Sequence, residues 1–162
     1  RSLPQERILV IGTGGLGHDP RVLFPPIDEV EEKWLPYHLH GRAQSQVSQQ
    51  EWIDYEVEAH HVAAAFLADD SIPDEVFGLH DDWDRAFMKM FCAGDMSAFD
   101  HWKPNEVVDA AGIGAMEVLS WIAAGATLGM LADASPDHRL QRVCREIGIG
   151  FGITSSGPVP IT

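Results

Sequence analysis

Ile8 to Pro20 reads ILVIGTGGLGHDP, and the fold is decided by this stretch of the sequence. Ile8 to Ile11 is a short apolar run rich in β-branched residues, which is typical of a strand buried on both faces of a sheet. Four of the next six residues are glycines, which allow backbone conformations closed to other residues and let a ligand or a neighbouring strand approach closely. The sequence therefore predicts a central strand that ends in a glycine-rich loop.

That loop places His18 just beyond the C-terminal end of the predicted strand, where open α/β sheets build their sites. A histidine there can donate or accept a proton near neutral pH, which suits general acid/base catalysis. A loop histidine that is simply hydrogen-bonded to the backbone fits the same spacing equally well. The loop alone leaves both interpretations open.

A dinucleotide site is a further alternative, because Gly12, Gly14 and Gly17 occupy the positions of a G-x-G-x-x-G fingerprint. The fingerprint requires a helix to begin within the motif, so that its N-terminus can hold the pyrophosphate. Here His18 is followed by Asp19 and Pro20, and no second strand ends in an acidic residue near the expected distance. The context thus disfavours a nucleotide site.

Further along the chain, apolar spacing predicts several elements. We expect irregular structure with at most one short helix over residues 20–36, because this region holds four of the ten prolines. The spacing predicts helices over residues 51–68 and 82–92, a helix that starts near Pro104, an almost wholly apolar helix over residues 115–131 and a closing strand over residues 147–153.

Glu117 is the single charged residue of the apolar stretch from Ala115 to Leu131. Burying an unpaired carboxylate costs several kcal/mol, so Glu117 must face an ion, a cationic partner or a helix end near solvent. Near a helix start, the helix dipole alone could account for it. A metal ligand is the sharper alternative.

The remaining candidate ligands are histidines without a specific metal motif. His38 and His40 are spaced as in H-x-H, and His60 and His61 follow Glu56 by about one helical turn. No H-E-x-x-H or comparable zinc signature occurs. Structural or surface roles are the simpler interpretation of all four histidines.

Composition limits the classes of partner. The formal net charge is −14, from 25 acidic residues against 11 Lys and Arg, and this charge repels nucleic-acid phosphates. No stretch reaches the roughly 20 uninterrupted apolar residues of a membrane span, and no signal peptide is visible. We therefore expect a cytoplasmic protein that binds neither nucleic acid nor membrane.

Three motifs in order carry a family resemblance: GTGGLGHDP from Gly12, WDRAFMKMFCAGD from Trp83, and AAGIGAMEVLSWIAAGATL from Ala110. Together they resemble the C-terminal half of the protocatechuate 4,5-dioxygenase catalytic subunit family. This LigB-like family is the class III group of extradiol ring-cleavage dioxygenases. The resemblance spans residues 8–128 and is far more specific than any one of its motifs.

The resemblance implies an α/β fold with a central sheet flanked by helices, in which residues 1–162 form a single partial domain, the C-terminal half of a catalytic domain. It places an acid/base histidine at His18 and the carboxylate ligand of Fe(II) at Glu117. The two histidine ligands of the family lie in the N-terminal half, which has no visible counterpart here. Gly17 departs from the family, which usually has serine at this position.

The expected function is therefore extradiol cleavage of a catecholic acid with O2, by a site that a complementary N-terminal segment or subunit completes, in an oligomer. The alternatives are a noncatalytic LigB-like structural subunit or binding module, and a self-contained metal site that uses His38, His40 or His60 with Glu117. The role of Arg85 stays open between a salt bridge and a substrate contact.

Overall fold

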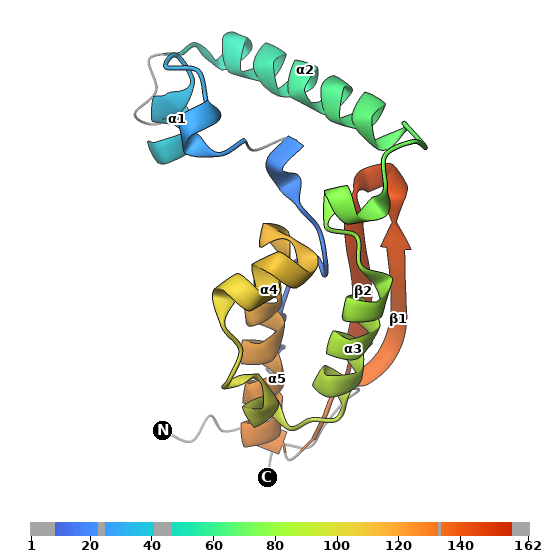
Figure 1. Ribbon diagram of the computed structural model, residues 1–162. Coiled ribbons are helices and arrows are strands. Elements are labelled where there is room, and N and C mark those ends of the chain that lie inside the picture. The colour runs from blue at the N-terminus through green and yellow to red at the C-terminus, as the bar shows by residue number, and fades with distance from the viewer. Residues whose placement is uncertain (1–8, 23–24, 41–46, 133, 157–162) are drawn as a thin grey trace.

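The computed structural model describes residues 9–22, 25–40, 47–132 and 134–156. Three helices and a β-hairpin form the body of the molecule, and two further helices form an arm that projects from it (Figure 1). The body contains α3 (Asp81–Cys92), α4 (Pro104–Ala111), α5 (Val118–Ala132), β1 (Asp137–Cys144) and β2 (Ile149–Ser155); the arm contains α1 (Leu35–His40) and α2 (Gln49–Leu67). The fold is α/β, as predicted, with a small antiparallel sheet.

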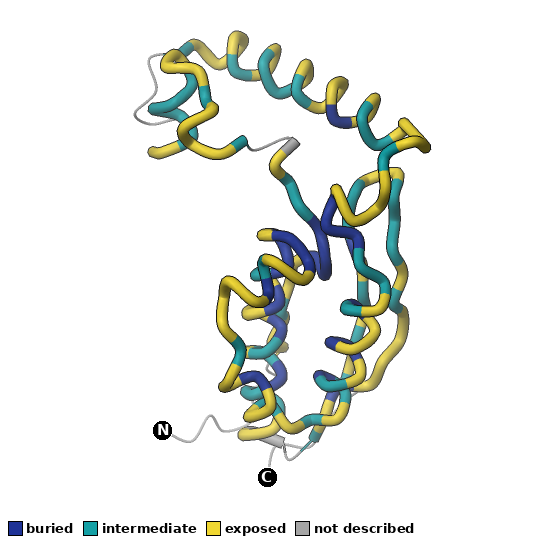
Figure 2. Tube along the Cα trace, viewed as in Figure 1, coloured by how far each residue is buried: buried dark blue, intermediate teal, exposed yellow. Residues whose placement is uncertain are grey.

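The arm forms for local reasons. Ser48 caps α2 by accepting a hydrogen bond from the backbone N–H of Glu51, whose side chain accepts one from the backbone N–H of Ser48. The helix predicted over residues 51–68 is thereby confirmed. In the short α1 region, Trp34 stacks on Tyr55 of α2 with ring centroids 4.3 Å apart. Ala63 is the only buried residue of α2, and Figure 2 shows the arm as largely exposed.

The helices of the body also begin and end at the predicted signals. α3 ends just before Gly94, whose φ of +84° is a conformation that glycine adopts without strain. α4 begins at Pro104, which lacks the N–H that a first-turn residue would leave unpaired. Both helices were predicted at these places and are confirmed.

The hairpin closes the chain. β1 and β2 pair antiparallel, with Cys144 opposite Ile149, and a short 3-10 turn that ends at Gly148 joins them. The closing strand predicted over residues 147–153 is confirmed as β2, and its partner is the amphipathic stretch that precedes the turn. α3 packs against β1, so the sheet lies beside the helix that follows the arm.

The central strand predicted from Ile8 to Ile11 is not formed. Ile8 lies outside the described residues, and residues 9–11 have no strand conformation. Leu9 and Ile11 are 81% and 68% exposed. A strand needs a neighbour to receive its hydrogen bonds, and within the described residues β1 and β2 pair only with each other. The apolar run is therefore present without the sheet that its pattern predicts.

The apolar helix predicted over residues 115–131 is divided. Ile113–Glu117 forms a 3-10 helix, η6, and α5 begins at Val118. By length and composition alone, residues 113–130 could cross a membrane, with a mean hydropathy of 1.4 and 28% of the segment buried. A core helix of a soluble protein passes the same test, so the expected absence of a membrane partner stays a prediction.

The core of the body anchors the glycine-rich loop. Phe87 of α3 is 1% exposed and lies against Phe91 and Trp121, with ring centroids 5.6 and 6.1 Å away. Leu16, from the loop, joins this cluster and has no exposed surface. Burying a leucine side chain stabilises a fold by about 1.5–3 kcal/mol, so the loop is held by packing as well as by hydrogen bonds.

Candidate functional site

The glycine-rich loop is fixed on two sides. The Leu16 N–H donates to the Gly150 carbonyl of β2, and the Gly150 N–H donates to the Gly17 carbonyl, each at 2.8 Å. On the other side, the Trp121 indole of α5 donates to the Gly14 carbonyl at 3.2 Å. The loop therefore runs between the hairpin and the start of α5, and its backbone is held in one conformation.

His18 is 8% exposed, and the structure defines the tautomer of its ring. Nδ1 lies 2.9 Å from the Leu16 carbonyl oxygen, which can only accept a hydrogen bond. In the neutral ring Nδ1 therefore carries the hydrogen, and Nε2 keeps its lone pair. The ring is thus oriented, and it has one nitrogen free to take up a proton.

Glu117 is the last residue of η6 and lies at the N-terminal end of α5. Its Oε2 accepts a hydrogen bond from the Gly15 N–H at 2.6 Å. The residue is exposed where the 3-10 turn meets α5, so it lies at a helix end near solvent, one of the three surroundings that the sequence allowed for this carboxylate. The helix dipole favours a carboxylate here, but the bond to the loop ties it to the same site as His18.

The structure brings His18 and Glu117 to the same few glycines. Gly15 bonds Glu117, and a Cβ on Gly15 would lie 2.8 Å from Cε1 of His18. Gly114 lies directly under the ring, because a Cβ on it would be 2.2 Å from Nε2. Residues three apart in a 3-10 helix share a face. Nε2 of His18, which lies over Gly114, is therefore on the side of η6 that carries Glu117.

These residues fit one part of a ferrous site. One carboxylate oxygen of Glu117 accepts the hydrogen bond from the Gly15 N–H. Within the described residues the other oxygen accepts no hydrogen bond, so it could bind a metal. A facial triad needs two histidines besides the carboxylate. The described part of the chain holds no cluster of three His, Cys, Asp or Glu side chains that could bind a metal. Glu117 thus fits as one ligand of a site with further donors.

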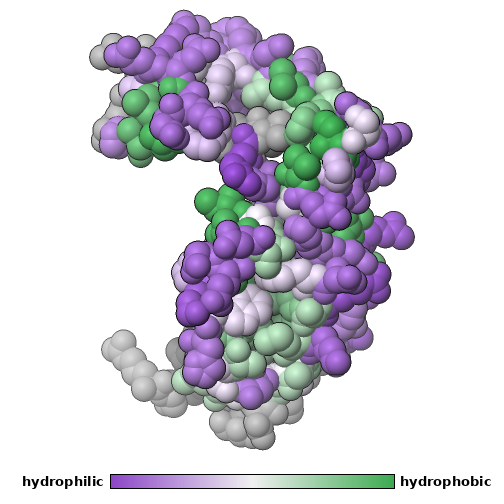
Figure 3. Space-filling view, in the orientation of Figure 1, coloured by the Kyte–Doolittle hydropathy of each residue, from purple (hydrophilic) through white to green (hydrophobic). Residues whose placement is uncertain are grey.

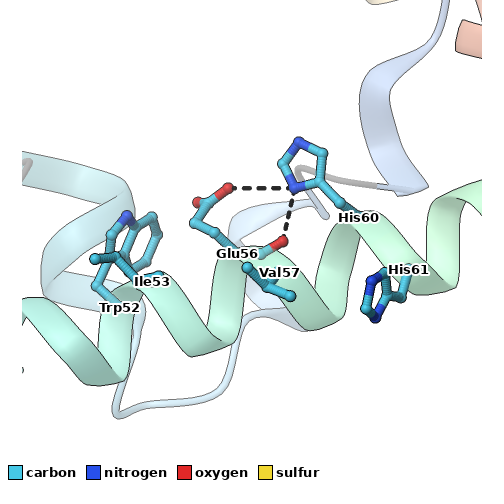
Figure 4. Close-up of a pocket in the computed structure, with 6 residues that line it drawn as sticks. All are labelled: Trp52, Ile53, Glu56, Val57, His60 and His61. Atoms are coloured by element: carbon cyan, nitrogen blue, oxygen red, sulfur yellow. Dashed lines mark hydrogen bonds and ion pairs between the residues drawn. The ribbon is translucent and has the colours of Figure 1, made fainter.

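The four other histidines considered as candidate ligands, His38, His40, His60 and His61, lie in the arm. Nε2 of His38 lies 3.4 Å from the hydroxyl oxygen of Tyr55. Figure 4 shows His60 beside Glu56, and Nδ1 of His60 lies 2.6 Å from the backbone carbonyl oxygen of Glu56. His61 points to another side of α2, and both histidines border a shallow apolar surface of that helix. The structure does not gather His38, His40 or His60 with Glu117, so the self-contained metal site is not supported.

The loop also departs from a dinucleotide site. A 3-10 turn, η1 (Pro20–Val22), follows His18, and no helix begins within residues 12–17. The pyrophosphate of a dinucleotide would therefore lack the helix N-terminus that binds it.

Arg85 forms a surface ion pair with Asp81, one turn earlier on α3, at 2.7 Å. The sequence interpretation missed the residue beside it. Asp84 is fully buried, and its Oδ1 accepts a hydrogen bond from the Gly17 N–H at 2.7 Å. The helical spacing of α3 could have identified Asp84 as buried, because it precedes the core residues Phe87 and Met88 by three and four positions and so shares their face.

Burial raises the pKa of Asp84 from 3.8 to about 6; the Asp81 charge adds to the shift, and hydrogen bonding from the Gly17 N–H and from Gln141 opposes it. The folded state therefore holds the proton more tightly than the unfolded state, and stability falls as pH rises from about 4 to about 6. Asp84→Asn should remove this loss of up to about 3 kcal/mol. Urea unfolding of native protein and variant across this range measures it; parallel curves would contradict the expectation.

Comparison with known proteins adds an independent finding. Residues 1–152 match the family described as the catalytic LigB subunit of aromatic ring-opening dioxygenase. The 2,3-dihydroxyphenylpropionate/2,3-dihydroxicinnamic acid 1,2-dioxygenase of Rhodococcus globerulus is 30% identical over 153 residues, which cover 93% of this chain and 46% of the relative. The enzyme of the same name from Paraburkholderia xenovorans is 35% identical over 121 residues, which cover 74% and 35%.

The chain therefore spans about half the length of the curated relatives that it matches. No solved structure matches it. The matched region contains the glycine-rich loop with His18, the η6–α5 segment with Glu117, and α3, whose Asp84 bonds the loop at Gly17.

Proposed function

The chain belongs to the family of catalytic LigB subunits of aromatic ring-opening dioxygenases, and on this premise we propose that it supplies part of an active site for extradiol cleavage of a catecholic acid with O2. The observation that carries the proposal is the joint contact of His18 and Glu117 with the glycines of one loop. An acid/base group and an anionic metal ligand are thereby side by side.

Glu117 is the residue of this chain that would hold Fe(II). The bound metal would bring the two catechol oxygens and O2 together and carry electron density between them. Gly15 orients the carboxylate through its N–H, as outer partners of metal ligands do. One oxygen of the carboxylate is thereby held in place, and the other would bind the metal.

His18 would manage the protons. Its Nδ1 hydrogen bond to the Leu16 carbonyl persists in both charge states of the ring, so the ring keeps its orientation while Nε2 gains and loses a proton. Nε2 would take up a hydroxyl proton of the catechol and return it as the ring opens, with both oxygen atoms of O2 retained in the product.

The remaining two ligands would be histidines of a complementary segment, either in the same polypeptide or in a second subunit. The coverage of about 45% of the relatives supports this proposal. So do the exposed apolar side chains of Leu9 and Ile11, which a neighbouring strand would cover. Figure 3 shows the surface hollowed between arm and body, with apolar side chains on both sides of the hollow.

The preferred substrate would be a catechol with an acidic side chain. The curated relatives are named for 2,3-dihydroxyphenylpropionate and 2,3-dihydroxicinnamic acid. The test is oxygen uptake and product identification with 2,3-dihydroxyphenylpropionate, protocatechuate and gallate, using native protein purified with every chain associated with it. Fastest turnover of the propionate compound is expected; turnover of none of the three would contradict the proposal.

Gly114→Ala is expected to lower kcat about 100-fold, because the new methyl group would meet Nε2 of His18 at 2.2 Å and displace the ring. Gly129→Ala is the matched control. Within the described residues, no atom apart from the helix's own nearby backbone lies within 4 Å of its Cβ position in α5, and alanine should stabilise that helix by up to about 1 kcal/mol. Oxygen uptake by the two variants measures the difference, and equal kcat values would show that the ring position is unimportant.

A further inference from the structure

Asp84 has no part in the function proposed above, yet it lies where α3, the glycine-rich loop and β2 meet. We propose that Asp84 is a positioning residue, which fixes the ring of His18 through the peptide group between Leu16 and Gly17. This inference rests on the proposed role of His18 as the acid/base group.

The geometry is that of a relay through one rigid unit. The Gly17 N–H donates to Oδ1 of Asp84 at 2.7 Å, and the Leu16 carbonyl oxygen lies 2.9 Å from Nδ1 of His18. This N–H and this carbonyl belong to the same peptide bond, which is planar and cannot rotate freely. Asp84 therefore holds the acceptor that orients the His18 ring, although the two side chains are not in contact.

The relay also has an electronic effect. A hydrogen bond at the N–H of a peptide group polarises the group and makes its carbonyl oxygen a better acceptor. The carboxylate of Asp84 thus strengthens the hydrogen bond from Nδ1–H and favours the tautomer that leaves Nε2 free. The arrangement corresponds to an aspartate and a histidine linked by a backbone amide in place of direct contact.

The site around Asp84 is built to fit it. A Cβ on Gly150 would lie 2.1 Å from Oδ2, and a Cβ on Gly17 would lie 3.0 Å from Oδ1, so glycine at both positions makes space for the carboxyl group. Within the described residues, Oδ2 has no hydrogen-bond partner. The glycine backbones thus enclose the carboxyl group, and its Oδ1 accepts the hydrogen bond from the glycine-rich loop.

A purely structural role does not account for this choice of residue. Burial without a cationic partner disfavours the charged carboxyl group and raises its pKa to about 6. Asparagine has the same shape and would accept the Gly17 hydrogen bond without a buried charge. A buried carboxyl group with a raised pKa, bonded to the residue that precedes the proposed acid/base histidine, is typical of functional sites.

The experiment compares Asp84→Ala, Asp84→Asn and Asp82→Ala in the native protein. Asp82 is an exposed neighbour on α3 and serves as the control. We expect Asp84→Ala to lower kcat by about 10- to 100-fold with little change in KM. Asp84→Asn, which keeps an acceptor for the Gly17 N–H but lacks the charge that polarises the peptide group, should recover part of this loss, and Asp82→Ala should match the native protein.

A second readout does not depend on activity. In iron-free protein with ¹⁵N-labelled histidine, the His18 ring should be the Nδ1–H tautomer in the native protein and in Asp84→Asn, and a mixture in Asp84→Ala. If Asp84→Ala does not fold, Asp84→Leu, which has nearly the shape of aspartate and no hydrogen-bond acceptor, should give the same mixture. An unchanged tautomer together with an unchanged kcat would overturn the inference, whereas an inactive native protein would count against the proposed function instead.

Discussion

Glu117→Gln is expected to weaken Fe(II) binding by at least about 100-fold and to remove ring-cleavage activity with it. Glutamine has the shape of glutamate, and its carbonyl oxygen can still accept the Gly15 N–H, so the contact between η6 and the loop is preserved. The substitution therefore removes the negative charge that a ferrous ion needs and little else. Iron content after anaerobic loading, together with oxygen uptake, measures both effects.

Glu106→Gln is the matched control for this substitution. Glu106 lies on the surface of α4, where it pairs with Lys103 at 2.6 Å. An exposed pair of this kind contributes little to stability, so this variant should keep its iron and its activity. Full iron binding by Glu117→Gln would show that the carboxylate is not a ligand, and its position would then be explained by the helix dipole and the Gly15 hydrogen bond.

His18→Ala should lower kcat by about 100- to 10,000-fold and leave the iron content unchanged. His18 is proposed as the acid/base group and not as a ligand, so the metal should stay bound while proton transfer fails. The Gly114 N–H donates to the backbone carbonyl of His18, and this contact does not need the ring. Turnover and iron content are to be measured on the same preparation.

His101→Ala is the control for the loss of a histidine, because His101 lies exposed in the turn before α4. It should behave as the native protein does. Loss of iron from His18→Ala would make His18 a ligand and contradict its proposed role. Unchanged kcat would leave it as a loop histidine bonded to the backbone, the alternative that its spacing also allows.

Local signals in the sequence predicted the helices well. The apolar spacing over residues 51–68, the proline at Pro104 and the glycine at Gly94 each act within a short stretch of chain, so α2, α4 and α3 could be placed without tertiary information. The strand at residues 8–11 failed for the opposite reason. Its pattern describes a buried environment that other strands must supply, and the described residues hold none that pairs with it.

The sequence identified the candidate residues of the site but not the contacts that bring them together. Spacing left His18 and Glu117 as isolated candidates 99 positions apart, and only the family resemblance linked them. Their common contact with Gly15 depends on tertiary packing of the loop against η6, which periodicity does not encode. The sequence left Glu117 between an ion, a cationic partner and a helix end near solvent, and the structure places it exposed where η6 ends and α5 begins.

Asp84 shows what a helical pattern can reveal when charge is considered with position. It lies on the apolar face of α3, and an acidic residue on such a face requires a partner. That partner is the backbone N–H of Gly17, which a sequence does not display. The pattern could therefore have marked Asp84 as unusual without identifying the group that it binds.

The central claim is that this chain supplies the acid/base and carboxylate side of an iron-dependent ring-cleavage site. Oxygen uptake by native protein, loaded anaerobically with Fe(II) and given 2,3-dihydroxyphenylpropionate, tests it most directly. The account predicts uptake that depends on the added iron and yields a yellow ring-opened product. Failure to bind iron, even with every associated chain present, would contradict it and leave a noncatalytic family member, or a binding module, as the better description.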